Sequence, residues 1–222
     1  MIELIEVSRK FGEETVLHSV SHRFEKGKIH GIEGNNGSGK TVMMKCICGF
    51  LRPSTGRILV RGKQVGKDMD FPENLGVIIE TPGFLGNMTG KKNLQILASL
   101  NRQVMDGEID AVMRQVGLDP GLKKSVQKYS LGMRQRLGIA QAIMEDPDLL
   151  ILDEPFNGLD KRGVQEIRSL LKELKQKGKT ILLASHNGQD IDELCDTVCE
   201  MEAGILQVVR TEHVKEGRDI AL

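Results

Sequence analysis

The sequence has no tryptophan, and its 222 residues include only one tyrosine and six phenylalanines. So few aromatic rings argue against a surface on which nucleic-acid bases stack. Neither sign of charge is in excess, because 31 lysines and arginines balance 31 aspartates and glutamates. The composition therefore gives no sign of a polyanion-binding surface, and we expect no nucleic-acid partner.

Long apolar runs and a secretory leader are also lacking. No run approaches the roughly 18 apolar residues that a membrane-spanning helix needs. Residues 1–6 contain no cationic region followed by an apolar one. We expect a soluble, cytoplasmic chain that is long enough for one large domain or for a core with a subdomain.

The four cysteines do not have the spacing of a zinc site. Cys46 and Cys48 are two residues apart in a predicted helix, so they face different directions. Cys195 and Cys199 have no second ligand pair at zinc-finger spacing. We predict buried free thiols rather than a metal site.

What the chain does contain is a phosphate-binding motif. Residues 34–41, Gly-Asn-Asn-Gly-Ser-Gly-Lys-Thr, fit the P-loop pattern G-x-x-x-x-G-K-[ST]. Gly37 and Gly39 allow positive φ and turn backbone N–H groups toward phosphate oxygens. Lys40 can reach the β- and γ-phosphates, and the hydroxyl of Thr41 can ligate Mg²⁺.

The segments on both sides of this motif support the P-loop interpretation. A helix predicted over 42–47 adds the positive end of its dipole, and a strand is predicted over 28–32. His30 and Glu33 are polar where a buried strand prefers apolar residues. A glycine-rich turn before an ordinary helix is the alternative, which the Gly-Lys-Thr spacing disfavours.

Two acids follow the apolar run 149–152, at the end of a predicted parallel strand where open α/β sheets bind ligands. Asp153 suits the Mg²⁺ shell, and Glu154 is placed to polarise or deprotonate an attacking water. A solvated strand end is the alternative, but with a P-loop upstream the pair is interpreted as Walker B. His186 follows the next core strand, 180–184, and can reach a γ-phosphate.

Hydrophobic periodicity divides the chain into strand-rich and helical parts. Further strands are predicted at 2–7, 56–62 and 75–79, with a hairpin over 198–209. Helical stripes run from Thr89 to Leu100, over 109–116, from Ser130 to before Pro147, and over 161–177. We expect an α/β fold with an antiparallel β subdomain and an all-helical insertion. The expected parts are core residues 1–84, a helical subdomain 85–145 and core residues 146–222.

In this order the motifs resemble those of an ABC-transporter ATPase, a P-loop NTPase, over roughly residues 1 to 205. Residues 130–136, Ser-Leu-Gly-Met-Arg-Gln-Arg, stand at the signature, and residues 157–160 stand at the D-loop. The resemblance implies ATP and Mg²⁺ as cofactors. It implies nucleotide contacts from Phe11, Gly34, Asn35, Asn36, Gly37, Ser38, Gly39, Lys40, Thr41, Val42, Ser130, Leu131, Gly132, Met133 and Asp160. It implies metal ligands Thr41, Glu80 and Asp153, and catalytic groups Glu154 and His186.

The signature also has a physical interpretation. Ser130 can N-cap the helix that follows, whose first N–H groups then form an anion site. In the family, this site completes the ATP pocket of the opposite subunit. The resemblance therefore implies a homodimer or heterodimer of ATPase subunits, bound to an integral-membrane permease at the inner face of the cell membrane.

Three positions depart from the family pattern. Met133 replaces a glutamine at the end of the signature, Glu80 replaces the Q-loop glutamine, and Val42 replaces a second hydroxyl residue after Thr41. Glu80 followed by Pro82, with the altered signature, looks most like the bacitracin-resistance and lantibiotic-immunity branch. Its members export peptide antibiotics.

Other functions explain the sequence less well. DNA-repair members of the family carry a long coiled coil, whereas about 90 residues without sustained heptads separate Lys40 from Ser130. Ribosome-acting members usually have two cassettes, and a small-molecule kinase does not explain the signature. We expect the motor of an exporter, with a non-transport ABC ATPase acting on nucleic acid or ribosomes as the alternative.

Overall fold

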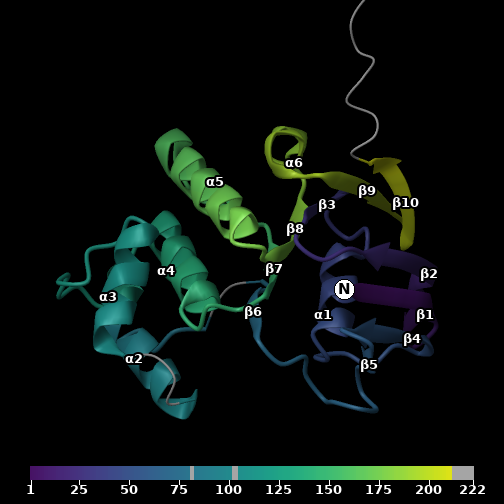
Figure 1. The fold of residues 1–222 in the computed structure, drawn as a ribbon, viewed down its shortest axis with the longest axis horizontal. Coiled ribbons are helices and arrows are strands. Elements are labelled where there is room, and N and C mark those ends of the chain that lie inside the picture. The colour runs from purple at the N-terminus through teal and green to yellow at the C-terminus, as the bar shows by residue number, and fades with distance from the viewer. Residues whose placement is uncertain (81–82, 102–104, 212–222) are drawn as a thin grey trace, which may run out of the picture. The chain divides into compact units, whose positions relative to one another are not determined.

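The computed structural model describes residues 1–80, 83–101 and 105–211, which fall into two compact units (Figure 1). Unit 1 comprises residues 1–72 and those from 182 onward, and unit 2 comprises residues 73–181. Pro82 lies outside the described residues. The predicted division into three parts stays a prediction.

Unit 1 contains the predicted antiparallel sheet, with strand order β2-β1-β4-β5. The strands are β1 (Ile2–Phe11), β2 (Glu14–Phe24), β4 (Thr55–Val60) and β5 (Lys63–Gln64). Leu17, Val20 and Phe24 are buried in β2, at spacings of three and four rather than two. The register with β1 shifts along the pair, and Ser19 has a φ of 48°. These β-bulges break the alternation, so the periodicity did not predict β2.

The second sheet of unit 1 has the order β10-β9-β3-β8. It contains β3 (Ile29–Glu33), β9 (Thr197–Glu202), β10 (Ile205–Arg210) and β8 (Thr180–Ser185), of which β8 begins in unit 2. β3 and β9 are parallel, whereas β9 and β10 form the predicted hairpin. The described residues of this unit also form the helices α1 (Lys40–Ile47) and α6 (Gly188–Leu194).

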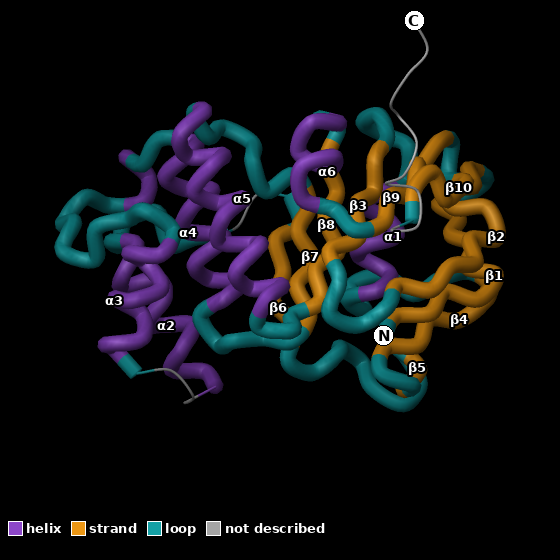
Figure 2. The backbone as a smooth tube through the Cα atoms, turned by 45° about the horizontal axis from the view of Figure 1, so that its top comes forward, coloured by secondary structure: helices purple, strands orange, loops and turns teal. Residues whose placement is uncertain are grey.

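Unit 2 is mostly helical (Figure 2). Its helices are α2 (Gly90–Asn101), α3 (Asp106–Gln115), α4 (Leu131–Ile143) and α5 (Lys161–Gln176), with a 3₁₀ turn η1 (Val126–Lys128). The strands β6 (Leu75–Ile78) and β7 (Leu149–Asp153) pair in parallel, and every residue of β7 is buried. The expected α/β fold with an all-helical insertion is confirmed. Among the described residues, no helix combines the length and the apolar character needed to cross a bilayer.

The prediction of buried free thiols is also confirmed. All four cysteines are buried and unbonded to one another. Burial raises the pKa of Cys46 to about 11 and that of Cys48 to about 12, so both thiols stay protonated. Such thiols are poor nucleophiles and poor metal ligands.

The polar residue in β3 is explained by two hydrogen bonds. His30 is 2% exposed, and its Nε2 lies 2.9 Å from the carbonyl oxygen of Glu25. Because a carbonyl can only accept, Nε2 carries the proton, and Nδ1 of the neutral ring accepts from the hydroxyl of Thr197 at 2.6 Å. Burial lowers the pKa of His30, although the Glu25 carbonyl opposes this effect. The neutral imidazole therefore belongs to the folded state.

We predict that His30 makes the protein less stable in mild acid. Below the ordinary pKa of 6.5, the unfolded chain takes up a proton that the folded chain resists, so stability falls as pH falls. In His30→Gln, which keeps a donor and an acceptor, the free energy of unfolding should fall less between about pH 7.5 and 5.5, by up to about 1.4 kcal/mol per pH unit. Urea unfolding measures this slope. Equal slopes in wild type and His30→Gln would contradict the prediction.

Candidate functional site

The phosphate-binding motif forms a loop between β3 and α1. Gly34, Gly37 and Gly39 have φ angles of 152°, 82° and 111°, a region that favours glycine. Gly39 is the N-cap of α1 and provides no side-chain cap for the first turn. The first N–H groups of α1 therefore have no side-chain cap from Gly39, and the helix dipole favours negative charge at this end.

Lys40 is held against this loop. Its side chain is 5% exposed, and Nζ donates to the carbonyl oxygens of Gly34 and, at 3.0 Å, Asn35. An ammonium group bound by loop carbonyls is fixed in position at low exposure, where its attraction for phosphate is screened less than at the surface. The loop therefore combines backbone donors with a buried positive charge.

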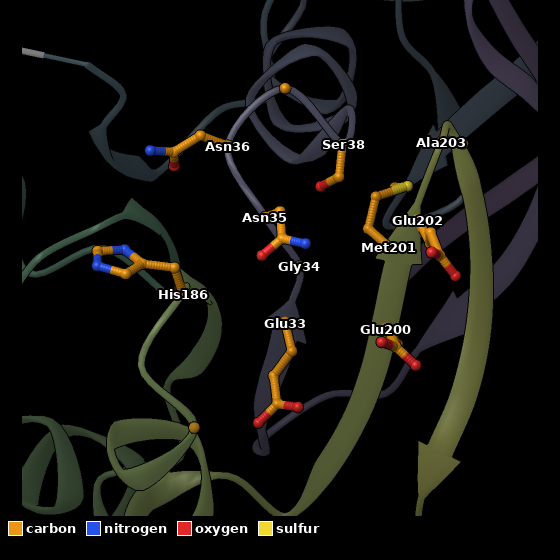
Figure 3. A pocket seen from close by; sticks show the side chains of 12 residues that line it. Glu33, Gly34, Asn35, Asn36, Ser38, His186, Glu200, Met201, Glu202 and Ala203 are labelled. Carbon is orange, nitrogen blue, oxygen red and sulfur yellow. The ribbon is translucent and has the colours of Figure 1, made fainter.

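A cavity of about 410 Å³ adjoins the first half of the loop (Figure 3). Residues 34–38 line it together with His186 and Gly188, and residues 200–203 of the β9–β10 hairpin form the facing wall. In Figure 3, His186 lies on one side of the loop residues Asn35 and Asn36, and Met201 lies on the other. The structure thus brings the predicted P-loop and the predicted switch histidine into one cavity.

Carboxylates give this cavity a negative lining. Glu33, Glu200 and Glu202 all line it, and Glu33 pairs with Glu200 in the β3–β9 register. Burial and the nearby charge of Asp192 raise the pKa of Glu33, while Arg210 opposes that shift. The cavity beside the P-loop is therefore partly acidic.

Unit 2 contains a second cavity, of about 380 Å³. It is lined by Glu80, Leu131, Arg134, Gln135, Asp153, Glu154, Asn157 and Gly158. The predicted Q-loop acid, the Walker B pair and one signature residue therefore meet in one place, although the sequence separates them widely. Asp153 is 7% exposed at the end of β7.

Two acids of this second cavity have unusual backbone conformations. The φ angle is 60° at Glu80 and 50° at Glu154, in the left-handed region that non-glycine residues seldom adopt. Glu154 also precedes Pro155, which restricts its backbone further. Strain of this kind concentrates at functional sites, because the surrounding structure must maintain it.

The predicted cap at the signature is confirmed. The hydroxyl of Ser130 accepts a hydrogen bond from the backbone N–H of Met133 at 3.2 Å and so caps α4. The start of α4 also packs closely against Gly158, since a Cβ on Gly132 would lie 2.6 Å from the Gly158 carbonyl oxygen. The signature and the D-loop segment therefore form one tightly packed unit.

Comparisons with known proteins identify the family of this chain. The profile described as "ABC transporter" matches residues 17–157. The chain is 42% identical to the bacitracin transport ATP-binding protein BcrA of Enterococcus faecalis over 93% of this chain and 68% of that protein. The chain belongs to the ABC transporter family. The identity is 34% with the lantibiotic transport ATP-binding protein SrtF of Streptococcus pyogenes, over 89% of this chain and 85% of the relative.

The fold of this ABC ATPase matches solved cassettes. The dimeric post-hydrolysis structure of the ATP-binding cassette MJ0796, bound to ADP and Pi, superposes with a TM-score of 0.83. That comparison covers 95% of this chain and 99% of the other, at 21% identity. It confirms the expected ABC ATPase fold. The chain is an ABC-type ATPase subunit, as its family membership establishes.

Other predicted site residues of the ABC ATPase lie outside the two cavities. Phe11 ends β1, is 43% exposed, and has the guanidinium carbon of Arg9 4.4 Å from its ring centre. The carboxylate of Asp160 caps α5 by accepting from the N–H of Gly163 at 2.8 Å. Thr41 and Val42 lie half-buried in the first turn of α1.

Two functional features were missing from the sequence-based site. The β9–β10 turn supports the P-loop, because the N–H of Gly204 donates to the Ser38 carbonyl at 2.9 Å. Gln135 and Arg134 line the second cavity, although neither was given a role. The helical spacing could have indicated that Gln135 is buried, since it lies four residues before Ile139 on the buried face of α4.

We predict that Gly34 is required for more than its φ angle. A Cβ at Gly34 would overlap the carbonyl oxygen of Met201. Gly37 is a matched control, because its φ is also positive but a Cβ there would meet nothing within 4 Å. Gly37→Ala should cost about 1–3 kcal/mol of unfolding free energy from strain alone, and Gly34→Ala about 4 kcal/mol or more. Chemical denaturation measures both, and equal losses would contradict a role for the Met201 contact.

Proposed function

We propose that this ABC ATPase is the motor subunit of an exporter of peptide antibiotics and that it works with a separate integral-membrane permease. The observation that carries the catalytic part is the cavity of unit 2, where Glu154 lies beside Asp153 and Glu80. The likeness to proteins named for bacitracin and lantibiotic transport supports the substrate class.

In this proposal, the P-loop of unit 1 holds the triphosphate. The backbone N–H groups at the start of α1 bind phosphate oxygens, and Lys40 turns its ammonium group to the β- and γ-phosphates. Phe11 stacks on adenine through the ring face opposite Arg9.

The donor atoms suit Mg²⁺. Within the described ranges, no three His, Cys, Asp or Glu side chains are arranged to hold a metal by themselves. Mg²⁺ usually takes one or two carboxylates together with substrate phosphates and water. Asp153, Glu80 and the hydroxyl of Thr41 offer such hard oxygen ligands. The ion would neutralise charge on the β- and γ-phosphates.

Glu154 is the proposed general base. Its carboxylate orients a water molecule and takes its proton as the water oxygen bonds to the γ-phosphorus. The bond from that phosphorus to the β–γ bridging oxygen breaks, and ADP leaves. His186 donates a hydrogen bond to the γ-phosphate and so stabilises the charge that develops there. These two residues are the proposed catalytic groups.

The signature acts on the ATP of a second subunit in this proposal. The N-terminus of α4, with Ser130, offers an anion site that its own chain's P-loop does not need. Two subunits facing each other head to tail, identical or different, would then bury two ATP molecules through opposed halves. Asp160, which caps α5, would contribute at the same interface. Dimeric cassettes of the same fold support this assembly.

The proposed permease explains how this chain contributes to transport, because none of its described helices can cross a bilayer. The subunit would bind the cytoplasmic face of the membrane through that partner. ATP binding would close the dimer, hydrolysis would reopen it, and the motion would drive the permease.

Removing the base should separate binding from turnover. Glu154→Gln keeps the shape of the side chain but cannot take a proton, so kcat should fall at least about 100-fold. ATP affinity should stay at the wild-type value, and a stable ATP-bound dimer should accumulate. Steady-state ATPase assays and size-exclusion chromatography with ATP measure these effects. Wild-type turnover would exclude Glu154 as the base.

Mixing two inactive variants tests the opposed arrangement. Ser130→Arg blocks the signature, and Glu154→Gln removes the base. A mixed dimer retains one intact site, which combines Glu154 of the first chain with Ser130 of the second. An equimolar mixture should therefore recover roughly a quarter of the wild-type ATPase rate. Each variant alone should stay inactive. Ser130→Arg should still bind ATP as a monomer, and Glu154→Gln should bind ATP and form the dimer described above. A mixture as inactive as its components would contradict the pairing of two copies through opposed halves.

A further inference from the structure

Two donors hold the backbone of Glu154. Its carbonyl oxygen accepts from the backbone N–H of Asn157 at 3.2 Å and from Nε2 of Gln135, also at 3.2 Å. The Asn157 bond closes a local turn three residues long. The Gln135 bond comes from α4, nineteen positions earlier in the sequence. It therefore ties the end of β7 to a different element.

The conformation of Glu154 needs such support. A non-glycine residue in the left-handed region costs on the order of 1–3 kcal/mol and persists only where its surroundings impose it. Two features destabilise this conformation of Glu154: its φ is 50°, and a proline follows it directly, which restricts its backbone. A relaxed backbone would point the carboxylate in a different direction.

Gln135 is suited to this task by its burial. The side chain is 8% exposed in a helix whose neighbouring buried residues include Leu137 and Ile139. Burying an amide is unfavourable unless it forms hydrogen bonds. Gln135 lines the cavity of unit 2, and its hydrogen bond to the Glu154 carbonyl places its donor atom.

α4 also contacts the segment after β7 at a second residue, Gly158. The side chain of Leu131 packs against Gly158, where a Cβ would overlap it. Together with Gln135, this contact fixes both ends of the stretch from Glu154 to Gly158. The helix therefore sets the backbone of the stretch rather than touching it at one isolated atom.

We propose that Gln135 is a positioning residue for ATP hydrolysis, which holds the strained backbone of Glu154 and thereby aims its carboxylate at the attacking water. The proposal rests on the proposed role of Glu154 as general base. Gln135 touches neither nucleotide nor water in this role. It acts through the carbonyl group of Glu154.

The test uses two variants of the full chain. Gln135→Glu has the same shape, but its carboxylate cannot donate and repels the Glu154 carbonyl. Gln135→Met fills similar space without polar atoms and remains available if the charged variant fails to fold. Each should lower kcat roughly 10- to 100-fold through misplacement of the base. KM for ATP should stay close to wild type, because Gln135 does not touch the nucleotide in this role. Gln141→Glu, on the same helix but only partly buried, is the matched control and should keep full activity.

A pH profile separates positioning from a merely structural role. The introduced carboxyl group of Gln135→Glu regains a donor when it is protonated, and burial raises the pKa of such a group. The ratio of its kcat to that of wild type should therefore rise as the pH is lowered from about 8 to about 6. The same ratio for Gln135→Met should stay flat, because methionine does not titrate.

The outcomes distinguish this inference from the function on which it rests. Wild-type kcat in both Gln135 variants, or a flat pH ratio for Gln135→Glu, would overturn the positioning role. Measured beside them, Glu154→Gln reports on the base itself. If Glu154→Gln loses turnover while both Gln135 variants keep it, the inference about Gln135 fails alone. If Glu154→Gln keeps turnover, the proposed chemistry fails instead.

Discussion

Directly after or close to the ends of three parallel strands, one residue has a positive φ angle. Gly34 follows β3 with a φ of 152°, Glu80 lies two residues after β6 with 60°, and Glu154 follows β7 with 50°. This geometry turns the chain sharply and presents its polar groups at the strand ends, where α/β sheets bind ligands. Glycine satisfies it without strain at the P-loop, whereas the two glutamates need support from neighbouring elements.

The two units hold these residues with positive φ angles through different contacts. In unit 1, backbone contacts hold the loop, with Gly204 donating to the Ser38 carbonyl and Met201 leaving no room for a side chain at Gly34. In unit 2, a side chain does so, since Gln135 donates to the Glu154 carbonyl. In unit 1 the contacts are made by backbone carbonyl groups, and the proposed anion ligands are backbone N–H groups. In unit 2 the contact is made to the Glu154 carbonyl, and the proposed reactive group is its carboxylate.

The sequence predicts what depends on local pattern. The P-loop letters, the apolar run of β7, the helical stripes and the cap at Ser130 all follow from spacing and residue type, and the structure confirms these elements. β2 was missed because bulges break its alternation. The support of Glu154 by Gln135 depends on how closely α4 approaches the end of β7, which no local pattern encodes. Asp160 was assigned to nucleotide through the family, while its carboxylate caps α5 in the structure.

The altered signature can be understood from the same contacts. Met133 lacks the amide of the usual glutamine, but α4 uses the backbone N–H of Met133, which donates to Ser130 whatever side chain follows it. The cap therefore survives the substitution. Two positions later, Gln135 keeps its amide, and that amide is the one that holds Glu154. The methionine thus stands where α4 needs a backbone donor, and the glutamine stands where it needs a side-chain donor.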